Sequence, residues 1–133
     1  MKKLLLLSLL FVVLPCMFSC DGDGEDNPRD IEGSSWTFTI TTGGTTFSGT
    51  FSISTQNGEA LAGFGTLEIG YIDAEFNMNG DIDKDDNISM FFNLLDPQWV
   101  DITVYSCKCK ANTMDGLARS NNWNNATFHA TRK

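Results

Sequence analysis

The stretch IDAEFNMNGDID, residues 72–83, decides the fold, because apolar and polar side chains alternate along it without a break. Strict alternation over this length is typical of a β-strand with one face in a hydrophobic core and the other in water. The segment DKDDN, residues 83–87, follows directly and predicts a charged turn. The expected core face of the strand carries Ile72, Ala74, Phe76, Met78, Gly80 and Ile82.

The same period of two appears along the rest of the chain from Ile31 onward. WTFTITT (residues 36–42) and TTFSGTFSIST (residues 45–55) alternate in this way, and Gly43 and Gly44 between them predict a two-residue hairpin turn. Further strands are expected within residues 59–70, 88–94, 99–111, 113–118 and 125–133.

Residues 31–133 are therefore expected to form one all-β domain of seven or eight short antiparallel strands. We predict an up-and-down β-barrel of about eight strands, because serial hairpins leave open edges unless the sheet closes on itself. A β-sandwich is the alternative. Gly63 and Gly65 predict a bulge or a close approach of strands. A domain of this size buries only a modest core, so any interior cavity should be small.

Residues 1–19 have the pattern of a signal peptide. Lys2 and Lys3 precede an apolar run at residues 4–14, which has the length of a secretory h-region. A helix that crosses a bilayer needs roughly 20 apolar residues, so this run is too short to serve as one.

The end of the leader, MFSC at residues 17–20, resembles the lipobox of bacterial lipoproteins. In a lipobox a small residue precedes a cysteine that is acylated and becomes the new N-terminus. Ser19 before Cys20 fits this pattern, whereas Pro15 before Cys16 does not. The resemblance implies lipidation of Cys20, and the three acyl chains of a mature lipoprotein hold a protein firmly in a membrane.

Residues 20–30, CDGDGEDNPRD, are expected to form an acidic, hydrated tether after the lipidated cysteine. An acidic stretch in this place resembles the export signal that sends Bacteroidetes-type lipoproteins to the outer face of the outer membrane. A solvated spacer without an address is the alternative. The expected location is the outer membrane or the cell surface, with a lipid anchor.

The charge of the chain excludes one class of partner. It carries 17 acidic and nine basic side chains, a net charge of −8, and Lys2 and Lys3 would leave with the leader. Phosphates would be repelled by such a surface, so a nucleic-acid partner is not expected. Without a polybasic patch, contact with the membrane should come from the lipid alone.

The sequence GSSW (residues 33–36), the serial hairpins and Arg132 near the C-terminus resemble the calycin-type barrels. This group comprises the lipocalins and avidins, and the resemblance is greatest to small lipocalin-like lipoproteins of gut Bacteroidetes. It implies that Trp36 packs across the closed end of the barrel with Arg132 over its ring, a cation–π contact. It also implies a barrel that holds a small apolar ligand or none, and no biotin-site residue is matched.

Three aromatic residues are candidate ligand contacts: Trp99, Tyr105 and Trp123. Trp99 follows DPQ at the mouth of a strand, and Trp123 lies in the asparagine-rich loop SNNWNNA, residues 120–126. Indole rings and amides together could bind an apolar or carbohydrate ligand. The alternative is a filled barrel that acts through its surface as an accessory subunit or an inhibitor of a protein partner. A cavity above about 300 Å³ would favour the first hypothesis, and a solid interior with an exposed apolar patch the second.

Cys107 and Cys109 form a C-x-C pair that should lie on one strand face beside Tyr105. Their β-carbons would be about 7 Å apart in an extended strand, whereas a disulfide needs about 3.8 Å. Two reduced cysteines that line the barrel are expected. A metal site and an unusual disulfide are the alternatives.

No catalytic residue, metal ligand or cofactor is predicted. His129 is the only histidine, and it alternates away from the core face of its strand without a recognisable nucleophile motif. Asp81, Asp83 and Asp85 have the spacing of the first ligands of an EF-hand, but the glycine and glutamate that complete such a loop are absent. A charged hairpin turn is the simpler interpretation, and the protein is not expected to be an enzyme.

Overall fold

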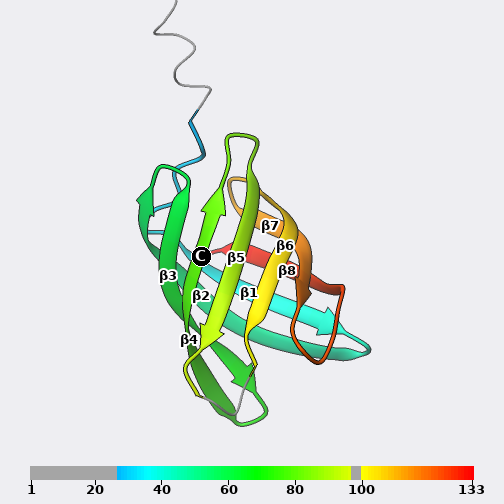
Figure 1. Cartoon of the computed structure of the whole chain (residues 1–133). Helices are drawn as coiled ribbons and strands as arrows, with labels where there is room; N and C mark the ends of the chain where they lie inside the picture. Colours follow the sequence, from blue (N-terminus) through cyan, green and yellow to red (C-terminus); the bar gives the residue numbers. More distant parts are fainter. Residues whose placement is uncertain (1–26, 97–99) are drawn as a thin grey trace, which may run out of the picture.

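The computed structural model describes residues 27–96 and 100–133, whose eight antiparallel strands close into a barrel (Figure 1). Each strand pairs with the next along the chain, and β1 pairs with β8. The predicted up-and-down barrel is confirmed, and the β-sandwich is wrong because this last pairing closes the sheet. The strands are β1 (Ser35–Thr42), β2 (Thr45–Asn57), β3 (Ala60–Ile69), β4 (Ile72–Ile82), β5 (Asn87–Leu94), β6 (Ile102–Cys109), β7 (Thr113–Arg119) and β8 (Ala126–Arg132).

The alternation that predicted β4 is visible in its burial. Ala74, Phe76, Met78 and Ile82 are buried, and the polar residues between them face water. Ile72 differs from the prediction: it is 53% exposed, because it is the first residue after the β3–β4 turn at the rim of the barrel. Within the described residues, no helix has the length and apolar character needed to span a membrane.

Five phenylalanine rings fill the middle of the barrel. Phe38 lies between 5.4 and 6.2 Å, centroid to centroid, from each of the other four. The closest pair is Phe76 with Phe92, stacked at 4.4 Å. Such pairs contribute about 0.5–1.5 kcal/mol each beyond the burial of their area. The members of this aromatic cluster are Phe38, Phe51, Phe76, Phe92 and Phe128.

Inward-facing glycines make room for these rings across the strands. Gly49 is the register partner of Phe38, and Gly65 lies between Phe51 and Phe76. A Cβ atom on Gly65 would lie 2.6 Å from Cζ of Phe76 and 2.3 Å from a backbone oxygen of β2. The predicted close approach is therefore found at Gly65, and also at Gly63, where a Cβ atom would meet the backbone of Ser52. The bulge lies on β2, between Ile53 and Thr55.

One end of the barrel is closed by the residues that precede β1. Ile31 is fully buried there, and Gly33, with φ of 82°, donates its N–H to the carbonyl of Ile53 at 2.7 Å. The buried Ser34 hydroxyl donates to the carbonyl of Ile31 at 2.6 Å and accepts the indole N–H of Trp36 at 2.8 Å. The only polar atom of the Trp36 side chain is thus satisfied inside the core, where an unpaired one would be costly.

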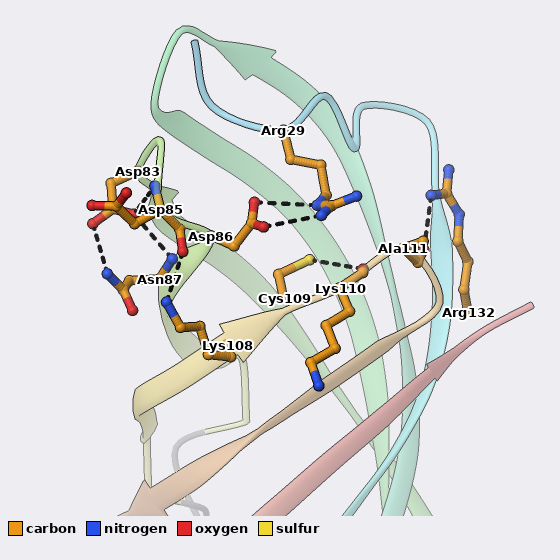
Figure 2. A network of polar contacts seen from close by, with 10 residues as sticks. All are labelled: Arg29, Asp83, Asp85, Asp86, Asn87, Lys108, Cys109, Lys110, Ala111 and Arg132. Atoms are coloured by element: carbon orange, nitrogen blue, oxygen red, sulfur yellow. Dashed lines mark hydrogen bonds and ion pairs between the residues drawn. The ribbon is translucent and has the colours of Figure 1, made fainter. Parts of the chain in front are cut away.

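Arg132 lies over Trp36 at this closed end. Its guanidinium carbon is 5.8 Å from the centroid of the Trp36 ring, and one of its nitrogens donates to the carbonyl of Ala111 at 3.4 Å (Figure 2). Arg132 shares the inward face of β8 but is exposed, because it is the last residue of the strand. The contact therefore covers the end of the barrel.

The chain that leads into the barrel is fastened to the same end. Arg29 donates to both carboxylate oxygens of Asp86 in the β4–β5 turn, at 3.0 and 3.2 Å (Figure 2). The Gln56 side chain donates to the carbonyl of Arg29 at 2.9 Å and accepts the N–H of Ile31 at 2.8 Å. Arg29, which falls within the predicted tether, is therefore in contact with the barrel.

Replacing Gly65 with alanine tests the fit between glycines and rings. We expect Gly65→Ala to lower the free energy of unfolding by about 3 kcal/mol, because the added methyl meets both a ring and a backbone oxygen. Urea unfolding followed by circular dichroism measures the change. Ser89→Thr adds a methyl to an exposed strand position and should be neutral. Equal stability of the two variants would contradict the packing described.

Candidate functional site

The open end of the barrel holds an apolar cavity of about 140 Å³. It lies where β2 and β6 begin and where β3 and β5 end, opposite the end at which the chain enters (Figure 1). We call it the mouth cavity. Its lining comprises Phe47, Leu67, Ile69, Leu94, Val100, Ile102, Asn122 and Trp123.

Trp123 forms one wall of the mouth cavity. Its ring is stacked on that of Phe47, with centroids 6.4 Å apart and planes 20° from parallel. The β7–β8 loop holds Trp123 through a hydrogen bond from the N–H of Ser120 to the Trp123 carbonyl, at 2.9 Å. The Ser120 hydroxyl also accepts the N–H of Asn122 at 3.1 Å. The loop therefore presents a half-buried indole at the entrance.

The depth of the mouth cavity is limited by the aromatic cluster. Leu94 lines the cavity, and the next inward-facing residue along β5 is the fully buried Phe92. The cavity is thus smaller than the 300–1,000 Å³ of a site for a whole drug-sized ligand, so the size that would favour a ligand held inside the barrel is not reached. A cavity of about 150 Å³ accommodates benzene. The mouth can therefore take one ring-sized apolar group, and the rest of a larger ligand would stay outside.

Among the three candidate aromatic residues, Trp123 lines the cavity and Tyr105 does not. Tyr105 lies on the outer wall, where its hydroxyl donates to the Asn125 side chain at 2.6 Å and the Arg119 guanidinium lies 4.8 Å from its ring centroid. Tyr105 therefore supports the β7–β8 loop through a contact on the outer surface of the barrel. Trp99 and the lipidation candidate Cys20 lie outside the described residues.

A β-bulge explains why the position of Tyr105 was predicted wrongly. Ser106 has φ of 48°, and the register shifts between Tyr105 and Lys108. The extra residue returns Cys107 to the inner face while Tyr105 stays outside. The expectation that Tyr105 shares a face with the cysteines is therefore incorrect.

Cys107 and Cys109 are both buried and free, as predicted, so the disulfide alternative is wrong. Burial, with smaller contributions from the neighbouring Cys109 and Asp115, raises the pKa of Cys107 to about 12. Burial likewise raises the pKa of Cys109 to about 11. Because the thiolate is the reactive form, neither side chain is an effective nucleophile at neutral pH.

In the acidic β4–β5 turn, the Asp83 carboxylate forms hydrogen bonds within the turn, whereas Asp86 binds Arg29. Asp83 accepts the N–H groups of Asp85 and Asn87 at 2.8 and 3.0 Å, and the Asn87 side-chain amide at 3.1 Å (Figure 2). These hydrogen bonds lower the pKa of Asp83. In residues 27–96 and 100–133, no three acidic, cysteine or histidine side chains are arranged to hold a metal ion.

His129 lies on the outer wall, as its alternation predicts. Its Nδ1 contacts a carboxylate oxygen of Asp115, and its Nε2 lies 3.3 Å from the hydroxyl of Thr131. The order carboxylate, imidazole, hydroxyl is that of a nucleophile triad. All three residues are exposed, however, and β8 is paired on both sides, so its backbone N–H groups are engaged in the sheet. An oxyanion hole is therefore not formed by this strand.

Compared with models of protein families and with curated proteins, the sequence matches none. The structure itself establishes a closed, eight-stranded antiparallel barrel, which is consistent with a calycin-like fold.

The buried thiols predict a pH dependence of stability. Folding raises the two cysteine pKa values from 9.0 to about 12 and about 11, so the folded state retains protons that the unfolded state loses. Their contribution should be complete below pH 9 and should decline as the pH rises toward 12. Urea unfolding at pH 8 to 11 measures the slope. The double variant Cys107→Ala/Cys109→Ala should show a flatter profile, and an unchanged slope would contradict the prediction.

Proposed function

We propose that this protein is a lipoprotein of the outer membrane or cell surface whose barrel binds a ring-sized apolar group at its mouth, without catalysis. The observation that carries the proposal is the mouth cavity, which is apolar, open to solvent at one end and walled by the stacked pair of Trp123 and Phe47. An apolar group that enters it would exchange contact with water for contact with aromatic and aliphatic side chains.

The position of the mouth suits a protein anchored at its N-terminus. Arg29 fastens the incoming chain to the closed end, so an anchor at Cys20 would hold that end toward the membrane (Figure 1). The mouth cavity would then point away from the membrane and toward the surroundings. The acidic residues between the anchor and Arg29 would act as the tether.

A non-catalytic role is supported by the chemistry of the described side chains. The two thiols have raised pKa values, and His129 with its Asp115 partner is exposed on the outer wall of the barrel.

A protein partner is the second candidate, and the rim of the mouth favours it. Tyr71 is fully exposed in the β3–β4 turn, and Ile72 and Leu95 are each about half exposed. Together with the mouth cavity they form an apolar end surface, which is typical of a protein interaction site. An aromatic or aliphatic side chain of the partner would then be the group that fills the cavity.

Binding at the mouth can be tested with the fluorescent apolar probe N-phenyl-1-naphthylamine. We expect saturable fluorescence enhancement, and Trp123→Ala should weaken the affinity by about tenfold or more, because one aromatic wall is removed. Phe91→Ala removes an exposed ring from the outer wall of β5 and serves as the matched control. Equal affinity of the two variants, or no saturable binding, would refute a site at the mouth.

The anchor can be tested separately by substitution of Cys16 and Cys20. Cys20→Ser should abolish incorporation of labelled palmitate and move the protein from the membrane to the soluble fraction in a bacterial host. Cys16→Ser should change neither property, since Pro15 precedes it. Retention of the label in Cys20→Ser would show that another residue carries the lipid.

A further inference from the structure

We propose a second binding site on the outer wall of the barrel, where a shallow groove across β2, β3 and β4 binds one pyranose ring of a neutral glycan. The groove has a volume of about 310 Å³, and Phe64 is the exposed aromatic ring in its lining. It shares no lining residue with the mouth cavity, although Leu95 at one end of it also belongs to the exposed apolar rim described above. We call it the Phe64 groove.

The strand register builds the Phe64 groove from two parallel rows of outward-facing side chains. Residues in one row are direct partners on neighbouring strands, and the two rows are two residues apart along each strand, roughly 7 Å. Leu95 adds an apolar end beside Glu75, whose carbonyl accepts the N–H of Leu95 at 2.9 Å. The rows are Ser52, Phe64 and Asn77, and Thr50, Thr66 and Glu75.

Phe64 presents a flat apolar surface within polar surroundings. It is 56% exposed, whereas its direct partners across the sheet are Ser52 and Asn77. A single exposed ring is common on protein surfaces. Here the ring lies in a groove that also contains hydrogen-bonding side chains. The groove therefore offers both the apolar surface and the hydrogen-bonding groups that a sugar requires.

The polar side chains of the Phe64 groove retain hydrogen-bonding capacity. Within the described parts of the chain, no hydrogen bond engages the Glu75 carboxylate or the Asn77 side-chain amide. The hydroxyls of Thr50 and Thr66 approach each other only at 3.5 Å. Glu75 can therefore accept two hydrogen bonds, and Asn77 can both donate and accept.

A pyranose ring matches this arrangement. One face of the sugar carries C–H groups that can pack on the Phe64 ring, and its edge carries hydroxyls that can donate to Glu75 and exchange hydrogen bonds with Asn77. The negative charge of the chain and the carboxylate of Glu75 disfavour phosphorylated sugars and uronic acids. A neutral glycan is therefore the class of ligand that fits.

The groove beside Phe91 provides a contrast. Phe91 is 40% exposed on β5, and its groove of about 370 Å³ is lined by the charged side chains of Asp101 and Arg119. Arg119 is already engaged with Tyr105. Phe91 has an exposed amide, Asn79, as its partner on β4, so the two grooves differ in the charged pair Asp101 and Arg119 and not in the presence of an amide. Because Phe91 lies outside the Phe64 groove, Phe91→Ala is a control for the loss of an exposed ring elsewhere on the wall.

The experiment uses the full chain purified in lauryldimethylamine oxide, a detergent without a sugar headgroup. Native gels that contain starch, dextran, laminarin, β-mannan or xylan should retard the protein in at least one case. Phe64→Ala should weaken the affinity for that polysaccharide by roughly tenfold. Glu75→Gln, which replaces a charge-assisted hydrogen bond with a neutral one, should weaken it by roughly threefold.

Two controls separate this site from the mouth. Phe91→Ala and Trp123→Ala should be retarded as strongly as the wild type, and thermal unfolding should be unchanged in Phe64→Ala because its ring faces solvent. Retardation lost in Trp123→Ala and kept in Phe64→Ala would assign the glycan to the mouth and overturn this inference. Migration unaffected by all five polysaccharides would overturn it as well, whatever the result of probe binding at the mouth.

Discussion

The packing of Phe38 against four other phenylalanine rings is the contact on which the rest of the barrel depends. The pairing of β1 with β8 fixes the circumference, so the interior has one volume to fill. Three of the large rings fit because a neighbouring strand has a glycine beside them. Gly49 lies opposite Phe38, and Gly65 lies between Phe51 and Phe76. The closure of the sheet, the size of the rings and the positions of the glycines must therefore all match the volume of the barrel interior.

This constraint moves binding away from the centre of the barrel. Rings that stack at 4.4 to 6.4 Å leave room for a ligand only beyond them, at the open end. The opposite end is filled by Ile31 and Trp36 and holds the incoming chain through Arg29. The two ends of the barrel therefore differ. The closed end stabilises the fold, and the open end and the outer wall are available for binding.

The sequence predicted most strands well because they alternate as residues 72–83 do. It could not predict the size of the mouth cavity, which depends on how far the buried ring of Phe92 and the rest of the aromatic cluster extend toward the open end. It also placed Tyr105 on the wrong face, since nothing in the pattern of residues marks Ser106 as a residue with positive φ. Trp123 could be predicted as a candidate because a tryptophan in an asparagine-rich loop is conspicuous. Phe64 was not predicted, because the alternation in its strand is too irregular to show which residues face outward.

Phe64 also illustrates why a closed barrel can carry binding groups on its wall. An exposed ring on an open sheet would promote edge-to-edge association, because unpaired backbone groups lie beside it. Here every strand is paired on both sides, so a second chain cannot extend the sheet. Outward-facing side chains of β2, β3 and β4 can then change with little effect on the core, whose identity is set by the inward-facing positions alone. Closure of the sheet thus leaves little room for a ligand inside the barrel, but it allows binding residues to arise on the outer wall.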